Sequence, residues 1–324
     1  MAKSTEPSRL GKLKKSEASV VVCCYTMQRL EDTLEAVHSV REQTFKPVEV
    51  IIVVDHNEEL YQRFLLEMNG DKSSLPPVRV LLNEGISGLS EARNVGVRAA
   101  VGEIIAFVDD DAIAEPDWLA NLVNPFQSSN DSIVAVGGKA VPIWPSGERP
   151  GWFPEELDWL VGCTYRGLPL YGDQIRNVPG CNMAFRRDIF DVAGFWDTQI
   201  GATGQLRKDG EEAEFCLRIK QAIPDGRICY EPKAVIWHKV LPDRASLRWV
   251  WRRSLMQGQS KKIVKVHSES CDPLSTENSY LRYLLVTSIP ERLRSFYKPQ
   301  SVSQVGTITL TVVATTIGYV RGRG

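Results

Sequence analysis

Apolar, β-branched runs alternate with helical segments in the first part of the chain, and this alternation constrains the fold more than any other feature. Strands are expected over 18–25, 48–54, 78–82 and 103–108, and helices over 31–43, 58–68 and 88–100. Runs that are apolar at every position are typical of parallel strands covered on both faces. The pattern predicts an α/β fold with an open, mostly parallel sheet flanked by helices.

Acidic residues follow two of these strands. Asp55 comes after the second expected strand, and Asp109, Asp110 and Asp111 come after the fourth. In open α/β sheets, ligands bind beside the carboxyl ends of the strands. We therefore expect a ligand site at this edge, although an Asp such as Asp55 also has the alternative of capping a turn.

The triplet Asp109, Asp110 and Asp111 brings three like charges to the end of an apolar strand. Such charges repel one another unless a cation neutralises them. Mg²⁺ and Mn²⁺ take oxygen ligands and accept diphosphate oxygens beside them. A solvated turn that caps a helix beginning within 116–122 is the alternative, and the triplet alone leaves both interpretations open.

The second half of the chain has a different pattern. Residues 140–200 are rich in Trp, Pro and Gly, and are expected to form loops and short strands around a pocket. A helix is expected over 211–221, a strand-like segment over 227–238 and a basic amphipathic helix over 246–266.

Residues 302–320 contain no charged side chain but include five Thr. Their number just reaches the length of a membrane-spanning helix. The sequence therefore predicts a membrane-embedded or interfacial segment. A soluble core element, such as a buried strand, is the alternative that the β-branched residues permit.

Charge is distributed unevenly and divides the chain. Residues 1–17 carry a net charge of +3, residues 18–243 carry −13 and residues 244–324 carry +9. We expect a polar leader, a catalytic domain over 18–243, a basic, membrane-proximal region over 244–300 and an apolar C-terminal segment over 301–324. The basic section favours an anionic surface as its partner. Nucleic acid is disfavoured, because the aromatic residues there lie in apolar stretches.

The seven cysteines and the N-terminal segment bear on the compartment. No C-x-x-C pair and no zinc-like spacing with histidine is present. We therefore expect free thiols in a reducing compartment. Residues 1–17 lack the apolar core of a signal peptide. These features predict a location at the cytoplasmic face of the cell membrane.

Six segments carry a resemblance to a known family. They are, in order, VVVCCYTMQRLEDTL, EVIIVVD, NEGISGLSEARNVGVRAA, GEIIAFVDDDA, GCNMAFRRDIFDVAGFWD and GEEAEFCLRI. In this order they resemble the inverting glycosyltransferase family 2, which has the GT-A fold, over about two-thirds of the chain. The opening stretch is also similar to archaeal-type members that act on dolichyl-phosphate-linked sugars, including a glucuronosyltransferase acting on glucosyl-dolichyl phosphate.

The resemblance implies roles for residues at the strand ends. Asp109 is expected to contact the ribose and Asp111 to hold Mn²⁺ or Mg²⁺ on the donor diphosphate, with Asp110 near the donor. Arg93 is expected near the donor too, with a helix-surface ion pair as its alternative. The residues expected to line the pocket of the nucleotide base are Tyr25 and Asp55.

The family's catalytic base lies in a Glu-Asp pair at the start of a helix, which Glu211 and Glu212 match here. The resemblance assigns the base to Glu212, where Asp is usual, and the extra methylene moves the carboxylate by about 1.5 Å. The helix dipole keeps a carboxylate at this position ionised. Ordinary acids of a first helical turn are the alternative for this pair.

Four further residues are weaker candidates. His238 matches a position where some members of the family place a metal ligand or a phosphate contact; a rim histidine is the alternative. Asn182 belongs to a segment that resembles the family's acceptor-side strand and is a candidate binding residue. Arg252 and Arg253 are expected to bind a phosphate of donor or acceptor, or anionic lipid.

Together these features predict an inverting, metal-dependent transfer of a sugar from a nucleotide donor, expected to be UDP-linked. The expected acceptor is a membrane-held polyprenyl- or dolichyl-phosphate glycan, as in protein N-glycosylation. A nucleotidyltransferase would need a Gly-rich loop after the first strand, and Tyr25–Leu34 contains no glycine. The alternative from another class is a non-catalytic, membrane-associated scaffold with a degenerate transferase fold.

Overall fold

The computed structural model describes residues 13, 17–69, 75–128, 132–170, 172–203, 206–208, 210–267 and 275–322. The predicted leader over 1–17 lies almost entirely outside the described residues. The described chain forms two compact units. The first contains the residues up to Lys139 together with Asp173–Arg207 and Glu211–Trp237, and the second contains Ala140–Gly172, Lys208–Gly210 and the residues from His238 onward.

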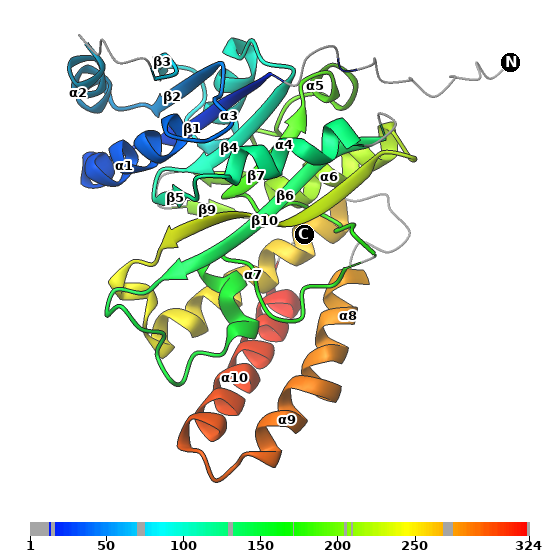
Figure 1. The fold of residues 1–324 in the computed structure, drawn as a ribbon. Coiled ribbons are helices and arrows are strands. Elements are labelled where there is room, and N and C mark those ends of the chain that lie inside the picture. Colours follow the sequence, from blue (N-terminus) through cyan, green and yellow to red (C-terminus); the bar gives the residue numbers. More distant parts are fainter. Residues whose placement is uncertain are drawn as a thin grey trace, which may run out of the picture. The chain divides into compact units, whose positions relative to one another are not determined.

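The N-terminal part of the first unit is a parallel sheet (Figure 1). Strands β1 (Ala18–Cys24), β2 (Glu49–Asp55), β3 (Val78–Asn83) and β4 (Ile104–Asp109) lie in the order β3-β2-β1-β4. Cys23 is in register with Val53 on one side and with Asp109 on the other. The carboxyl ends of β1, β2 and β4 therefore meet at one edge, which confirms the predicted α/β sheet.

Helices α1 (Leu30–Arg41), α2 (Glu58–Met68) and α3 (Leu89–Ala99) connect these strands, as the sequence predicts. Strands β1, β2 and β4 are apolar at nearly every position and are buried on both faces, whereas the outer strand β3 is only partly buried. Gly96 lets α3 approach β1 closely, because a Cβ at this position would lie 2.5 Å from a methyl group of Val21. The start of α2 is capped by Asn57, whose side chain accepts a hydrogen bond of 3.0 Å from the Leu60 N–H.

The remainder of the sheet makes it a mixed one. Strand β7 (Asn182–Arg186) runs antiparallel to β4, and β6 (Ile133–Ile143) runs antiparallel to β7. β10 (Arg227–Lys239) and the short β5 (Ala112–Ala114) complete eight strands. Strand β6 is absent from the sequence prediction, although its run IVAVGG is apolar. β8 (Gly201–Thr203) and β9 (Leu206–Lys208) form a separate pair, and α4 (Trp118–Ser128) and α5 (Ile189–Ala193) follow β5 and β7.

An aromatic cluster fixes helix α6 (Glu211–Ala222) against the sheet. The ring centroid of Phe215 lies 4.4 Å from that of Trp196 and 5.3 Å from that of Phe185. Phe107 of β4 packs edge-on against Trp196 at 6.1 Å. Because such pairs prefer defined geometries, the cluster determines where the N-terminus of α6 lies.

The second unit is mainly helical. It contains the 3₁₀ helices η2 (Glu155–Val161) and η3 (Pro242–Arg244), helices α7 (Leu247–His267), α8 (Ser275–Tyr283), α9 (Ile289–Arg294) and α10 (Pro299–Arg321), and the π-helical turn η4 (Leu284–Ser288) between α8 and α9. The carboxylate of Glu156 is fully buried and accepts hydrogen bonds from Arg292 at 2.6 and 2.8 Å and from the Ser288 hydroxyl at 2.8 Å. This buried ion pair fixes α9 to η2.

Helices α7 and α10 pack closely through two glycines. A Cβ at Gly258 of α7 would overlap the Thr315 carbonyl oxygen, and a Cβ at Gly318 of α10 would overlap that of Leu255. The expected helix over 246–266 forms, but its buried side is made partly by small residues such as Ser254, while Leu247 is exposed. The expected amphipathic division is therefore weak, because close helix contact needs small side chains there.

The segment 302–320 lies within the helix α10, so the expected alternative of a buried strand is wrong. Among the described residues, α10 is the one helix that is long and apolar enough to cross a membrane. Ile308 and Ala314 are buried, whereas Val313 and Val320 are exposed. The helix is therefore partly buried against the unit and partly exposed.

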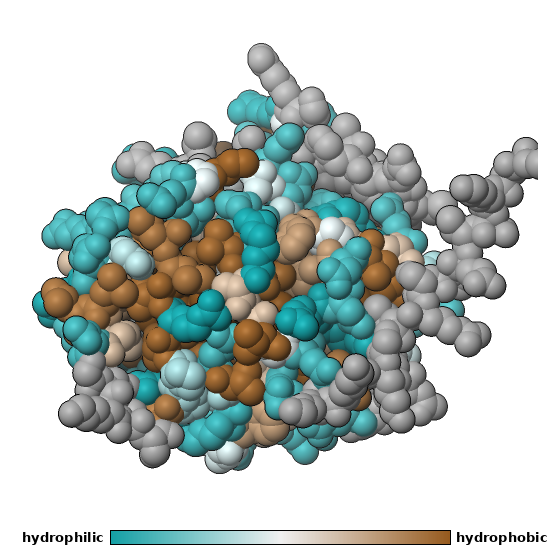
Figure 2. Space-filling model, turned by 90° about the horizontal axis from the view of Figure 1, so that it is seen from above, coloured by the Kyte–Doolittle hydropathy of each residue, from teal (hydrophilic) through white to brown (hydrophobic). Residues whose placement is uncertain are grey.

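Two further features concern the cysteines and one face of the molecule. The six cysteines that the structure describes are free, and burial raises the pKa of the Cys23 and Cys216 thiols to about 12. These thiols are therefore poor nucleophiles. Seen from above the view of Figure 1, apolar side chains gather among hydrophilic ones on that face (Figure 2).

Candidate active site

The acidic triplet lies where β4 ends and β5 begins. Asp109 is the last residue of β4, and Asp110 and Asp111 form the turn that leads into β5. Asp110 and Asp111 are buried, whereas Asp109 is partly exposed. A solvated turn, the alternative interpretation of the triplet, does not match this burial.

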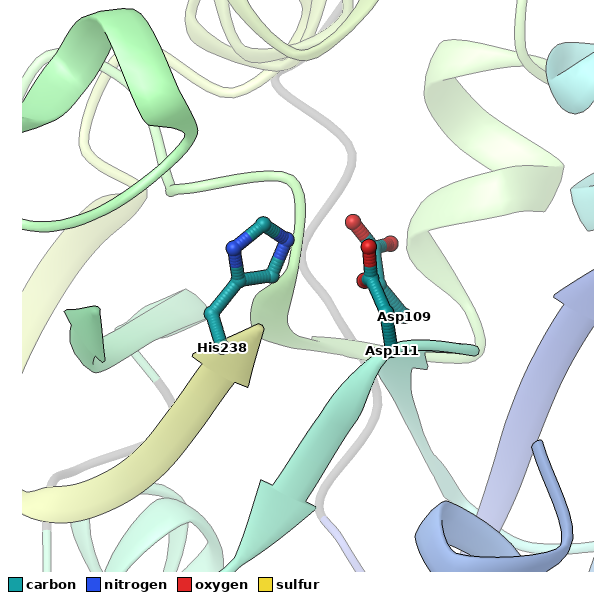
Figure 3. Close-up of side chains that lie close together, drawn as sticks. All are labelled: Asp109, Asp111 and His238. Atoms are coloured by element: carbon teal, nitrogen blue, oxygen red, sulfur yellow. The ribbon is translucent and has the colours of Figure 1, made fainter. Parts of the chain in front are cut away.

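His238 faces two of these carboxylates (Figure 3). It follows Trp237 on β10 and is buried. One ligand atom from each of Asp109, Asp111 and His238 lies within 4.8 Å of the others. Two carboxylate oxygens and an imidazole nitrogen converging in this way fit a divalent cation such as Mn²⁺. Next to the imidazole, the Cys163 sulfur lies 3.8 Å from Nδ1 of His238.

A basic residue that the sequence analysis missed lies against the triplet. Nη1 of Arg29 lies 2.6 Å from Asp110 Oδ1 and 2.9 Å from Asp111 Oδ2. Arg29 comes just after the first strand, four residues beyond Tyr25. The sequence signal for this pair was a basic residue soon after the first expected strand, combined with acidic residues directly after the fourth.

One guanidinium does not balance three carboxylates. Burial raises the pKa of Asp110 to about 7; Arg29 opposes the shift, and the neighbouring charges of Asp111 and Asp109 add to it. Oδ2 of Asp110 is buried without a hydrogen-bond partner among the described residues. The negative charge remaining at this edge is the electrostatic reason why a cation fits here.

Asp55 is the last residue of β2, and Tyr25 directly follows the adjacent parallel strand β1. The Asp55 carboxylate accepts hydrogen bonds from Asn83 Nδ2 at 2.6 Å, from the Ser87 hydroxyl at 3.1 Å and from the Gly88 N–H at 2.9 Å. Asp55 therefore also orders the loop before α3, in agreement with the turn-capping alternative. Tyr25 is exposed, which leaves its ring available for contact with a flat base.

Arg93 and the pair Glu211–Glu212 form a buried cluster. Nη1 of Arg93 lies 3.3 Å from one carboxylate oxygen of Glu211 and 3.3 Å from one of Glu212. Its Nη2 donates a hydrogen bond of 3.2 Å to the carbonyl oxygen of Gly180, and its guanidinium carbon lies 5.1 Å from the centroid of the Trp196 ring. Arg93 thus forms an ion pair, but a buried one, unlike the expected helix-surface alternative.

The acids of the first turn of α6 differ in their contacts. Glu214 accepts hydrogen bonds from Arg218 at 2.5 and 2.8 Å, which is an ordinary pair within a helix. Glu212 is partly buried beside Gly180, where a Cβ would overlap its carboxylate. The absence of a side chain at Gly180 therefore makes room for Glu212.

The remaining candidates have other surroundings. The Asn182 side chain is fully buried; it accepts from Trp118 Nε1 at 2.8 Å and donates to backbone carbonyls at 3.0 and 2.9 Å. These bonds give it a structural task, and its contact with a ligand stays a prediction. Arg252 and Arg253 lie on α7 of the second unit, and their phosphate contacts also stay predictions.

Comparison with known proteins relates this fold and its residues to sugar transferases. A family model described as "Glycosyl transferase family 2" matches residues 19–194. Over 310 residues the chain is 36% identical to a "Glucosyl-dolichyl phosphate glucuronosyltransferase" of Haloferax volcanii, covering 94% of this chain and 96% of that protein. It is 28% identical over 242 residues to the succinoglycan biosynthesis protein ExoM of Rhizobium meliloti, covering 74% and 72% of the two chains. The mannosyltransferase PcManGT of Pyrobaculum calidifontis, solved with GDP-Man and Mn²⁺, has a TM-score of 0.57 at 17% identity, covering 94% of this chain and 87% of that one.

Proposed function

The chain belongs to glycosyl transferase family 2, and on that basis we propose that it transfers a sugar from a UDP-linked donor to a dolichyl- or polyprenyl-phosphate glycan. Its fold is GT-A and it is a glycosyltransferase. The relative from Haloferax volcanii, 36% identical over nearly its whole length, bears the name of a glucuronosyltransferase for glucosyl-dolichyl phosphate. A glucuronosyl donor and a lipid-phosphate acceptor are therefore our first choice of substrates.

The observation that carries the proposal is the convergence of Asp109, Asp111 and His238 within 4.8 Å, at the edge of the sheet where Asp55 also lies. When bound there, Mn²⁺ or Mg²⁺ would neutralise charge on the donor diphosphate and so favour its departure. Asp111 and His238 would hold the ion with Asp109 beside them; Asp109 would also contact the ribose, and Asp110 would lie near the donor. Tyr25 and Asp55 would hold the base of the nucleotide.

The acidic pair at the start of α6 supports the acceptor half of the reaction. In an inverting transfer the acceptor oxygen bonds to the anomeric carbon while the bond from that carbon to the diphosphate oxygen breaks. The proton of the acceptor hydroxyl passes to a base, which we assign to Glu212. Arg93, whose Nη1 lies 3.3 Å from a carboxylate oxygen of Glu212, would orient this carboxylate between turnovers. Glu211 shares the same guanidinium and supports this arrangement.

The lipid-linked acceptor implies a membrane surface as partner and, following the sequence, the cytoplasmic face of the cell membrane. Protein N-glycosylation is the process to which a dolichyl-phosphate glycan of this kind would contribute. The net charge of +9 in residues 244–324 supports this location, and Arg252 and Arg253 are its candidate phosphate contacts.

The test is release of UDP by purified protein with Mn²⁺ or Mg²⁺. UDP-glucuronate, UDP-glucose and UDP-N-acetylglucosamine are compared, with and without glucosyl-phosphate lipid in detergent. We expect acceptor-dependent release with UDP-glucuronate, abolished by EDTA. No release from any UDP-sugar with either metal would overturn the proposal and favour the non-catalytic scaffold.

A further inference from the structure

The second unit exposes aromatic and aliphatic side chains at the turn between α9 and α10. Phe296 and Tyr297 are each 71% exposed, and Leu293 and Val302, which flank them, are 55% and 56% exposed. Large apolar side chains exposed together in this way mark an interaction surface. We call these four residues the apolar tip.

The apolar tip is held on a fixed support. Arg292, which directly precedes Leu293, forms its buried ion pair with Glu156, and Tyr280 of α8 donates a hydrogen bond to the backbone carbonyl oxygen of Glu156. On the other side of the turn, Gln304 of α10 donates a hydrogen bond of 2.9 Å to the Gly151 carbonyl oxygen. Both arms of the α9–α10 hairpin (Figure 1) are therefore tied to the body of the unit.

The charge around the apolar tip is basic. Residues 275–322 contain five Lys or Arg and two Glu, a net charge of +3. Both acids face partners within the unit: Glu277 lies 2.8 Å from Lys261 and Glu291 lies 2.8 Å from Arg166. Arg282, Arg294, Lys298 and Arg321 are exposed, and of these Arg294 and Lys298 lie between Leu293 and Val302, within the chain segment of the tip.

We propose that the apolar tip inserts into the headgroup region of an anionic lipid membrane, with Arg294 and Lys298 on lipid phosphates. Aromatic rings with basic neighbours are typical of the boundary between headgroups and acyl chains. Lys298 fits this description, because its Nζ lies 5.9 Å from the centroid of the Tyr297 ring. The inference deepens the proposed function, from which it takes the lipid-held acceptor, by assigning the residues that meet the lipid.

The same packing assigns α10 to the protein rather than to a membrane crossing. Its C-terminal half lies against α7 at Gly258 and Gly318. At that level α7 carries Lys261, paired with Glu277, and Lys262. Charged groups are costly at the centre of a bilayer. The protein therefore enters one leaflet through the apolar tip, and α10 does not span the membrane.

The test is sedimentation of the full chain with vesicles, in the absence of donor and acceptor. Vesicles of phosphatidylcholine alone are compared with vesicles that contain about 30% phosphatidylglycerol, enough to give a negative surface potential. We expect binding to the anionic vesicles that weakens as NaCl is raised. The double substitution Phe296→Ser with Tyr297→Ser should weaken it by about tenfold or more.

Matched variants distinguish binding through the apolar tip from non-specific binding of exposed apolar side chains to vesicles. Leu65→Ser with Leu66→Ser removes two exposed apolar side chains from α2 and should leave vesicle binding unchanged. Arg294→Glu with Lys298→Glu should remove the preference for anionic vesicles. Binding by the Phe296/Tyr297 variant equal to that of the wild type would overturn the inference, as would resistance of the membrane-bound protein to alkaline carbonate extraction, which indicates a spanning helix.

Two further measurements keep the outcomes distinct. Light scattering of both proteins in solution checks the oligomeric state; a dimer that the tip substitutions dissociate, without lipid binding, would show that a second copy covers the tip and would overturn the inference. UDP release with a detergent-dispersed acceptor should be the same for the tip variant and the wild type. If the wild type binds vesicles but releases no UDP, the proposed function fails and the lipid surface stands.

Discussion

Nη1 of Arg29 lies 2.9 Å from Oδ2 of Asp111, so the expected metal ligand already faces a cation of the protein. Arg29 also contacts Asp110. With Arg29 removed, two buried carboxylates lose their counter-charge. In EDTA, the free energy of unfolding of the variant Arg29→Met should therefore be about 3–5 kcal/mol lower than that of the wild type. Arg29→Lys keeps the positive charge and should lose less stability.

Mn²⁺ should recover part of this loss, because a divalent cation supplies the missing positive charge. We expect the Mn²⁺-induced rise in Tm to be larger for Arg29→Met than for the wild type. Denaturation followed by circular dichroism, with EDTA or Mn²⁺, measures both quantities. Equal Tm shifts in the two proteins would contradict a metal site next to Arg29.

Asp111→Asn should abolish binding of Mn²⁺ to the protein without donor, and His238→Gln should weaken it. Both residues belong to the cluster within 4.8 Å, and each substitution removes one ligand. Isothermal titration with Mn²⁺ measures the affinity, and titration with UDP plus Mn²⁺ measures the consequence for the nucleotide. Asp117→Asn is the control, since Asp117 is exposed and accepts a hydrogen bond from Thr44. Unchanged Mn²⁺ affinity in Asp111→Asn would mean that the ion binds elsewhere.

Glu212→Gln should lower kcat by about 10²–10⁴-fold while the variant still binds UDP and Mn²⁺, because it removes the base without touching the donor site. The matched control is Glu214→Gln on the same turn of α6, where the carboxylate pairs with Arg218. It should keep nearly full activity. Single-turnover assays with saturating acceptor make the comparison independent of acceptor affinity. Loss of activity in the Glu214 variant alone would reassign the base.

Glu49 predicts a pH dependence of stability. Burial raises its pKa, but hydrogen bonds from Arg79, from the Val101 N–H and from the Ser19 hydroxyl outweigh burial and hold the pKa of Glu49 below its ordinary value. A lowered folded-state pKa contributes stability that is present above the unfolded pKa of about 4.3 and is lost as the pH falls through the folded value.

Glu49→Gln should therefore cost about 1–3 kcal/mol of unfolding free energy at neutral pH and should flatten the loss of stability below about pH 4.3. Urea denaturation at a series of pH values measures both effects. Glu59→Gln, an exposed position on α2, serves as the control and should behave like the wild type. A variant as acid-sensitive as the wild type would show that Glu49 is not the responsible group.

The contact between α7 and α10 gives a prediction with an internal control. Gly318→Ala introduces a Cβ that overlaps the Leu255 carbonyl oxygen, so it should destabilise the protein by about 1–3 kcal/mol. Gly306→Ala, on the same helix, meets nothing within 4 Å and should be neutral or stabilising, because Ala favours a helix over Gly. Thermal denaturation distinguishes the two. Equal Tm values for the two variants would mean that α7 and α10 can move apart at this contact without loss of stability.

The sequence predicts the parallel half of the sheet well, because its β-branched runs and the helices between them are local patterns. Strand β6 was missed, since its pairing with β7 joins residues distant in the chain. The acidic edge was predicted from Asp55 and Asp109, which follow strands. Arg29 was not predicted, because its contact with Asp110 depends on how β1 and β4 bring their ends together, and its place after the first strand does not by itself identify the partner.

Gly180 bears on how catalytic activity is inferred from the sequences of related proteins. Its carbonyl oxygen accepts from Arg93, and a side chain on it would overlap the Glu212 carboxylate. A relative with any other residue at this position would keep every acid of the site in its sequence and yet have its base displaced. A search for catalytically inactive members of the family should therefore compare the residue at the position of Gly180 as well as the charged residues of the site.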